Sequence, residues 1–158
     1  MSRISPTRAD VVQFLQEASE ALNRQLPPPK DVFSFAGEGE SLSDELLELA
    51  IKGDKTGTTS WPVPNPRHWD EGDLSVILDS TGRPSAIMRT LSLTEYKFKD
   101  VPEDFALSEG EGDYEEYRRG HFSFYSRQEN GDKFGDDSLV LCERFEILYS
   151  RASEVISK

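Results

Sequence analysis

The sequence predicts an α+β fold with a mainly antiparallel or mixed sheet. Its strand-like runs occur in separate blocks interrupted by helical segments, without the steady strand–helix alternation of a doubly wound fold. Its 158 residues fit one domain of ordinary size, large enough to bury a core of its own. No internal repeat is visible along the sequence.

Residues 7–24 are expected to form the first helix, because apolar side chains recur there at helical spacing. Thr7 followed by Asp10 is a Thr-x-x-Asp pattern, which is typical of a helix start. The helix must end before Pro27, since proline cannot continue it. The next run, DVFSF at residues 31–35, places Val32 and Ser34 on one side and Phe33 and Phe35 on the other, over a length that fits only a short strand.

Two further helices are expected, over residues 43–52 and 114–127. The first has an apolar face formed by Leu46, Leu47, Ala50 and Ile51. Ser43 is its expected cap, and Gly53 stands at the C-terminal position that favours a positive φ. The second starts with the letters DYEE, in which an aspartate and a glutamate three positions later form a capping box.

The second half of the chain carries the clearest strand signals. LSVILD and SAIMRTLSL are β-type runs, and the turn residues DSTGRP between them, with Gly82, predict a hairpin. WPVPNPRHWD, ahead of the hairpin, contains three prolines and is expected to be irregular. SLVLCERFEILYS predicts a long last strand, in which Cys142 is expected to be a core residue and not a nucleophile.

The composition limits the partners and the compartment. With a formal net charge of −12, action on RNA would require a local basic pocket, although the charge also fits a protein that only needs to be soluble. A single cysteine excludes an intrachain disulfide and favours a reducing compartment. No stretch approaches the roughly 18 apolar residues of a membrane span, and the N-terminus lacks the apolar core of a signal peptide. We therefore expect a soluble, cytoplasmic protein without membrane contact.

The segment GDKTGTTS, residues 53–60, combines a lysine with several hydroxyls. It is not a nucleoside triphosphate loop, because its glycines flank the lysine on either side and it follows a helix. In an extended chain Lys55 and Thr59 would face one way, and Thr56, Thr58 and Ser60 the other. A turn at Gly57 would instead bring Lys55 and Thr58 together. The alternative is a plain connection with a solvated lysine.

An acidic loop, SEGEGD at residues 108–113, is the second candidate for chemistry. Its carboxylates could hold a hard divalent cation or supply a general base, but Asp113 already has a capping role and the loop lacks the order of a calcium hand. Periodicity indicates that His121 is a packed, hydrogen-bonded histidine. No motif requires a cofactor, and a zinc site is not expected, since the chain has no Cys/His cluster.

Together these pieces resemble the ASCH domain family, which is related in fold to the PUA domains, and in particular its longer bacterial-type members. The family pattern Gly-x-Lys-x-x-Thr-x-Arg/Ser follows a helix here too, and is matched by Gly53, Lys55, Thr58 and Ser60. Further matching blocks are a Gly-Asp that opens the hairpin, EGEGD before a helix with a histidine, and VLCERFEIL near the end. The resemblance covers roughly residues 40–150.

The resemblance implies a small PUA-like β-barrel flanked by helices, with a cleft beside the Gly-x-Lys-x-x-Thr segment. Residues 40–158 would form the ASCH domain, and residues 1–39 would be an N-terminal helix and proline-rich lead-in that packs on it. Many members have an arginine where this chain has Ser60, a difference that removes a bidentate contact to an anion.

The resemblance also implies an RNA-related role, with single-stranded RNA or a modified nucleoside as the partner. The expected function is a hydrolase acting on RNA, a ribonuclease; the alternatives are a non-catalytic RNA- or nucleotide-binding module and an amidohydrolase of an acetylated cytidine nucleoside. In the amide-hydrolysing scheme Lys55 would be the base or electrostatic group, Thr58 the nucleophile and Glu111 the proton relay. For RNA cleavage, Lys55 would stabilise phosphate charge and the hydroxyl of Tyr96 or Ser126 would assist.

The expected residues fall into two groups. Those expected to be catalytic are Lys55, Thr58, Glu111, Tyr96 and Ser126. Those expected to bind substrate are Gly53, Thr56, Ser60, Glu109, Asp113, His121 and Arg144.

Overall fold

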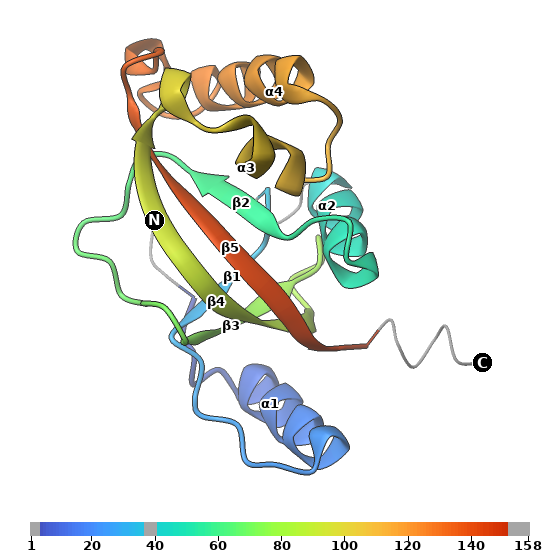
Figure 1. Ribbon diagram of the computed structural model, residues 1–158. Coiled ribbons are helices and arrows are strands. Elements are labelled where there is room, and N and C mark those ends of the chain that lie inside the picture. The colour runs from blue at the N-terminus through green and yellow to red at the C-terminus, as the bar shows by residue number, and fades with distance from the viewer. Residues whose placement is uncertain (1–3, 37–40, 152–158) are drawn as a thin grey trace.

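The structure is a computed structural model that describes residues 4–36 and 41–151 (Figure 1). The strands are β1 (Asp31–Phe33), β2 (Gly57–Ser60), β3 (Leu74–Leu78), β4 (Pro84–Lys97) and β5 (Leu139–Ser150). The helices are α1 (Ala9–Leu22), α2 (Ser41–Lys52), α3 (Glu103–Ser108) and α4 (Tyr114–Ser126), with 3-10 turns at Phe98–Asp100 and Gly131–Lys133. The three predicted helices, the hairpin and the long last strand are confirmed, whereas α3 was not predicted.

The five strands form one mixed sheet in the order β1-β3-β4-β5-β2. β1 pairs with β3 in parallel, and the other neighbours are antiparallel. The predicted α+β class is therefore confirmed. Among the described residues β1 and β2 are the two edges and do not pair with each other, so the sheet is not closed and the expected barrel is not confirmed.

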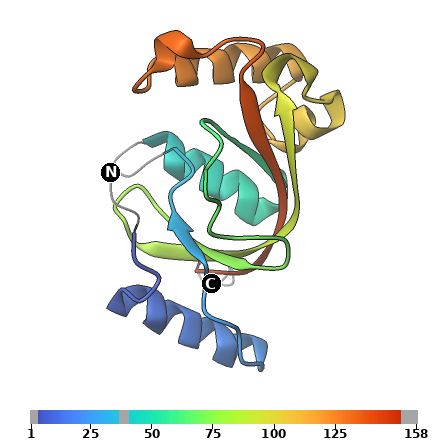
Figure 2. The same cartoon turned by 90° about the vertical axis from the view of Figure 1, so that its left-hand side faces the viewer.

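The helices α1 and α2 cover opposite faces of the curved sheet (Figure 2). On the outer face, Val11 and Phe14 of α1 are fully buried in a core that contains Val76 of β3. On the inner face, Leu47 of α2 packs in a core that contains Phe145 of β5. The period-two alternation of each strand supplies apolar side chains to both faces.

The helices α3 and α4 lie at the far end of the long strands β4 and β5 (Figure 1). Their aromatic residues form a third core with the 3-10 turns and with Cys142, which is buried as predicted. The expected capping box is present, because Asp113 accepts from the Glu116 backbone N–H and Glu116 accepts from that of Asp113. α4 is therefore fixed at the end that adjoins the acidic loop.

Two predicted helix starts are wrong. The cap position of α1 is Arg8 and not Thr7, because the Thr7 hydroxyl and backbone N–H both bond to the Ser5 hydroxyl. The Arg8 guanidinium pairs with Asp10. α2 begins at Ser41, so Ser43 lies inside the helix, where its buried hydroxyl accepts a hydrogen bond from the Ala36 backbone N–H.

The predicted boundary between residues 39 and 40 lies outside the described residues and stays a prediction. β1, which belongs to the expected N-terminal segment, is paired into the sheet by β3. In the part of the chain that the structure describes, no helix has the length and apolar character to cross a membrane.

Candidate functional site

A cavity of about 160 Å³ lies beside the edge strand β2, between α2 and α4. Its lining combines apolar side chains from α2 and the residues after β1 with charged side chains from the two loops that the sequence singled out. The lining residues are Phe35, Ala36, Leu42, Leu46, Lys55, Thr58, Thr59, Glu109, Glu111, Gly120, His121, Phe124, Tyr125 and Arg127. A larger hollow of about 590 Å³ along α1 has no comparable group of buried charges among its described lining residues.

The deepest charged contact of this cavity joins Lys55 and Glu109. The Lys55 Nζ lies 2.9 Å from Glu109 Oε1 and donates a second hydrogen bond of 2.8 Å to the Gly57 carbonyl. Both charged side chains are almost fully buried, at 1 % and 2 % exposure. Burial of charge on this scale costs free energy unless each charge is paired and hydrogen-bonded, and these two satisfy that condition.

The other oxygen of Glu109 connects the ion pair to α4. Glu109 Oε2 accepts a short hydrogen bond from the Thr59 hydroxyl and lies 3.3 Å from His121 Nε2. Because Thr59 donates its one proton to Glu109, the Tyr117 hydroxyl 2.9 Å away must be the donor to Thr59. Burial would raise the pKa of Glu109, but the charges of Lys55 and His121 outweigh it and hold that pKa well below its usual range.

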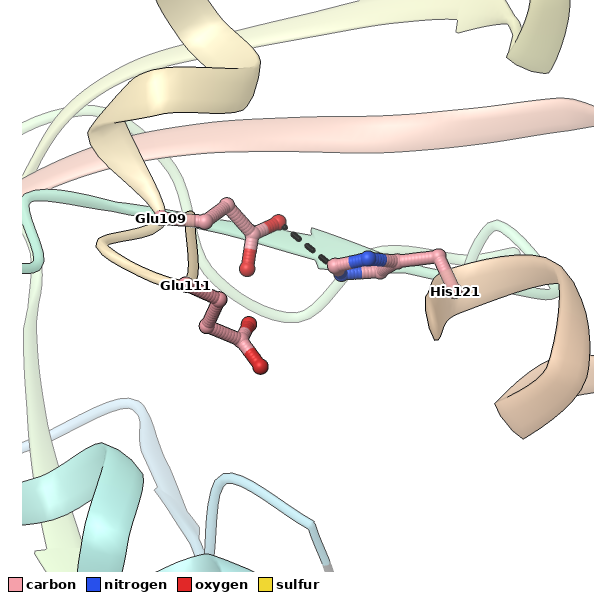
Figure 3. A group of neighbouring side chains, drawn as sticks. All are labelled: Glu109, Glu111 and His121. Carbon is pink, nitrogen blue, oxygen red and sulfur yellow. Dashed lines mark ion pairs between the residues drawn. The ribbon is translucent and has the colours of Figure 1, made fainter. Parts of the chain in front are cut away.

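Both ring nitrogens of His121 lie beside oxygen acceptors. Its Nδ1 lies 2.9 Å from the Tyr117 carbonyl, which can only accept, so Nδ1 carries a proton. Its Nε2 faces the Glu109 carboxylate, which also accepts (Figure 3). Burial would lower the pKa of His121, but the charge of Glu109 outweighs it and raises that pKa, which favours the imidazolium form beside this carboxylate.

Glu111 lies beside Glu109 on the same loop, and both carboxyl groups are near His121 (Figure 3). Burial and the negative charge of Glu109 raise the pKa of Glu111. Two neighbouring carboxyls whose pKa values are pushed in opposite directions are typical of sites that use one as a fixed charge and the other in proton transfer. Glu109 fits the first role and Glu111 the second.

The same three side chains offer a possible set of metal ligands. One ligand atom from each of Glu109, Glu111 and His121 lies within 4.8 Å of the others. However, the Glu109 oxygens already bind Lys55 and Thr59, and a cation would lie close to the Lys55 ammonium and would require His121 to lose a proton. This set of charges therefore fits an internal ion-pair network better than a metal site.

Strand β2 directs its hydroxyls to opposite faces. Thr59 is the register partner of Cys142 and faces the core beneath α4, whereas Thr58 is the register partner of Glu143 and faces the inner side of the sheet. The extended alternative of the sequence is thus the observed one, with Lys55 and Thr59 on the same side. Among the described residues, the Thr58 hydroxyl has no hydrogen-bond partner, although Thr58 lines the cavity.

Close backbone packing explains why the two loops meet. A Cβ on Gly57 would lie 2.2 Å from Ser108 Oγ and 3.0 Å from the Phe105 ring, so only glycine allows α3 to approach β2. The Thr56 backbone N–H donates to the Ser108 carbonyl at 2.7 Å, which closes the same contact. The acidic loop is thereby held against the lysine segment.

The structure brings together five of the residues expected from the sequence, and these are Lys55, Thr58, Glu109, Glu111 and His121. The other seven lie outside the cavity lining. Ser126 ends α4 and is exposed, and Tyr96 packs at the margin of the aromatic core. Arg144 lies over the Phe105 ring and pairs with Asp104 at 3.1 Å.

Four expected binding residues have other surroundings. Gly53 ends α2 with φ +87°, Thr56 is exposed, Ser60 ends β2, and Asp113 caps α4.

Several cavity residues were not singled out from the sequence, and these include Thr59, Phe35, Phe124, Tyr125 and Arg127. The alternation argument did place Thr59 on the same side as Lys55, which was a usable signal. The sequence contains no such signal for Phe35 or Arg127, because they reach the cavity through the packing of segments far apart in the chain.

The fold and the cavity define a small α+β domain with a lysine, hydroxyls and carboxylates at the edge of its sheet. The family model for the ASCH domain matches residues 31–149, and the chain belongs to this family. A protein from Enterococcus faecalis V583 has a similar crystal structure, with 27 % identity, a TM-score of 0.71, and coverage of 87 % of this chain and 92 % of that one.

The crystal structure of an ASCH domain from Lactobacillus crispatus JV V101 is also similar in fold. Its TM-score is 0.73 at 24 % identity, over 94 % of this chain and 98 % of that one. No curated protein matches the sequence.

Proposed function

We propose that this protein is a cytoplasmic hydrolase acting on RNA, with single-stranded RNA or a modified nucleoside as substrate and one nucleoside unit bound in the cavity. Its family is generally associated with RNA. The observation that carries the proposal is the buried Lys55–Glu109 ion pair in a cavity that Thr58 also lines. A costly pair of buried charges at a concave site is a recognised mark of function.

The size and lining of the cavity fit a single nucleobase better than a long stretch of RNA. Its volume of about 160 Å³ and its apolar walls, which include Phe35 and Phe124, suit a flat aromatic ring. The protein as a whole carries a net charge of −12, which opposes long contacts with a polyanion. Arg127 at the cavity supplies a local positive charge for a phosphate or ribose-linked anion.

In this proposal Lys55 acts as an electrostatic group. Its ammonium is held by Glu109 and by the Gly57 carbonyl, so it is placed to stabilise negative charge and does not serve as the base. If the bond that is hydrolysed is an amide, Thr58 is the nucleophile, and Glu111, whose pKa burial raises, relays a proton to the leaving group.

The amide-hydrolysing reaction is a second candidate, and one observation favours it. Tyr96 and Ser126, the hydroxyls expected to assist cleavage of the RNA chain, lie outside the cavity. Thr58, which the amide-hydrolysing scheme requires, lines it. A substrate such as an acetylated cytidine nucleoside would place its acyl group beside Thr58.

The test is to incubate the protein with short single-stranded RNA and, separately, with N4-acetylcytidine. Thr58→Val and Lys55→Met should each lower turnover at least 100-fold, whereas the control variants Thr94→Val and Lys52→Met, at exposed positions, should retain it. Product analysis separates chain cleavage from deacetylation. Absence of turnover by the unmodified protein on both substrates, with measurable binding, would replace the hydrolase by a binding module.

A further inference from the structure

The edge strand β2 uses only alternate residues of its backbone to bond to β5. The Phe145 N–H donates to the Thr56 carbonyl at 3.0 Å, and opposite residues of an antiparallel pair alternate between bonded and non-bonded positions. Thr58 and Ser60 therefore occupy bonded positions. Thr59, between them, occupies a non-bonded position and directs its backbone N–H and C=O away from β5.

Two hydrogen bonds show what this edge of β2 faces. The Thr59 carbonyl accepts from the Tyr125 hydroxyl at 2.8 Å. The carbonyl of Gly57, which has the same orientation two residues earlier, accepts from Lys55 Nζ at 2.8 Å. Tyr125, Lys55 and Thr59 itself all line the cavity. The outward backbone groups of β2 thus face side chains of the candidate site.

The Thr59 N–H lies on the same side of the strand as the Thr59 carbonyl. Among the described residues, no hydrogen bond is donated by this N–H. Backbone N–H groups that are sheltered from solvent are almost always paired, with protein or with another molecule. A backbone donor at a cavity without a protein acceptor is therefore available to a bound molecule.

We propose that the Thr59 backbone N–H is the oxyanion donor of the site, the group that binds the acyl oxygen of an amide substrate as negative charge develops on it. This inference rests on the proposed function in its amide-hydrolysing form, because it takes Thr58 as the nucleophile. Thr59 directly follows Thr58, so the donor belongs to the peptide unit attached to the nucleophile. The residue after the nucleophile supplies an oxyanion donor in α/β-hydrolases as well, on an unrelated fold.

The position of this donor is fixed without a substrate. Tyr125 holds the Thr59 carbonyl, and Glu109 accepts a hydrogen bond from the Thr59 hydroxyl, which in turn accepts from Tyr117. The neighbours of Thr59 on both sides are paired with β5. A donor that is already in place stabilises a developing charge without reorganisation during the reaction, which is the main requirement of an oxyanion site.

The direct test removes the N–H alone. Replacement of Thr59 by its α-hydroxy acid turns the peptide bond into an ester, which keeps the side chain and loses the donor. We expect kcat for N4-acetylcytidine to fall about 100-fold or more, the usual cost of losing one oxyanion donor, with KM changed less than about threefold. A Thr59 ester that folds and keeps its kcat would overturn the proposal.

The same replacement at Ser60 is the matched control. It removes an N–H that bonds to β5 and lies outside the cavity lining, so Tm should fall while kcat is kept. An equal loss of kcat in the two esters would assign the effect to weakened strand pairing and would also overturn the proposal.

A second measurement requires neither the ester nor turnover. N4-acetylcytidine is titrated into Thr58→Val, which cannot be acylated, while the backbone amides are followed by NMR. We expect the Thr59 amide proton to move downfield as the acyl oxygen accepts from it, whereas the Ser60 amide proton, already bonded to β5, stays in place. Binding that leaves the Thr59 proton unshifted would overturn the proposal. So would a through-hydrogen-bond coupling of the free protein from the Thr59 amide to a protein carbonyl.

The proposed function and this inference fail in different ways. An unmodified protein that binds N4-acetylcytidine through the Thr59 N–H without hydrolysing it would refute the hydrolase and keep the donor. An active protein whose Thr59 ester is equally active would refute the donor and keep the hydrolase. A protein that neither binds nor hydrolyses N4-acetylcytidine would overturn both.

Discussion

Gly110 and Asp54 lie in direct backbone contact, and this contact holds the acidic loop against the segment that carries Lys55. A Cβ on Gly110 would lie 2.6 Å from the Asp54 carbonyl oxygen, and the residue has φ +76°. A side chain at position 110 would therefore clash with the Asp54 carbonyl and would be strained by the positive φ. The acidic loop therefore depends on this glycine for its position beside the lysine.

Gly110→Ala should lower the free energy of unfolding by about 2 kcal/mol or more, because it adds a backbone clash to the strain of positive φ. Gly53→Ala is the matched control, since it has φ +87° and open space around it, and should cost about 1 kcal/mol. Urea unfolding of both variants measures the difference. Equal losses would show that the Asp54 contact is not tight in solution.

Lys55→Met should destabilise the protein by about 3–5 kcal/mol, because it leaves the Glu109 carboxylate buried without its lysine. Glu109→Gln should cost a similar amount for the converse reason. The double variant should be less destabilised than the sum of the two, since neither Lys55 nor Glu109 is then left charged without the other. The loss of the Glu109 partner of His121 is common to Glu109→Gln and the double variant. A double-mutant cycle by urea unfolding checks this, and additive losses would contradict a coupled pair.

The raised pKa of Glu143 predicts a pH-dependent stability. A carboxyl that is harder to ionise in the folded state favours folding in its protonated form, so its contribution falls as pH rises from the ordinary value of 4.5 to about 7 and then levels. Over that pH range the contribution of Glu143 to the free energy of unfolding should fall by about 3 kcal/mol. Between pH 5 and pH 8 the free energy of unfolding should fall more in the unmodified protein than in Glu143→Gln. The control Glu146→Gln should behave like the unmodified protein. Parallel losses in all three would show that Glu143 titrates normally.

Tyr125→Phe should cost about 1 kcal/mol, because the Tyr125 hydroxyl donates a hydrogen bond of 2.8 Å to the Thr59 carbonyl in the core beneath α4. Tyr96→Phe is the control, since the Tyr96 hydroxyl has no hydrogen-bond partner within the described ranges, and should change stability by less than about 0.5 kcal/mol. Thermal unfolding of the two variants measures the contrast. An unchanged stability of Tyr125→Phe would show that this hydrogen bond does not stabilise the position of β2.

Local patterns predicted most of the elements. The hairpin around Gly82 and the capping box at Asp113 depend on residues a few positions apart, and both are confirmed. The wrong starts at Thr7 and Ser43 have a common cause. In each case a residue outside the helix, Ser5 for Thr7 and Ala36 for Ser43, bonds the hydroxyl that would have made the cap.

The site was less predictable, because it depends on which loops meet. Glu109 and not Glu111 binds Lys55, a choice that spacing within EGEGD does not determine. It follows from the turn at Gly110, which aims Glu109 inward and leaves Glu111 at the cavity wall. Sheet register, likewise, is a long-range property, so no local pattern places Glu143 opposite Thr58.

The helix α1 precedes the part of the chain that the family model matches, yet Val11, Phe14 and Ala18 have no exposed surface. A shortened chain that began at residue 31 would keep every residue of the cavity. It would also uncover the outer face of β3 and β4, an apolar surface of the kind that drives self-association. The helix thus covers the apolar outer face of the sheet, whereas the cavity at the β2 edge is formed entirely by residues that follow it in the chain.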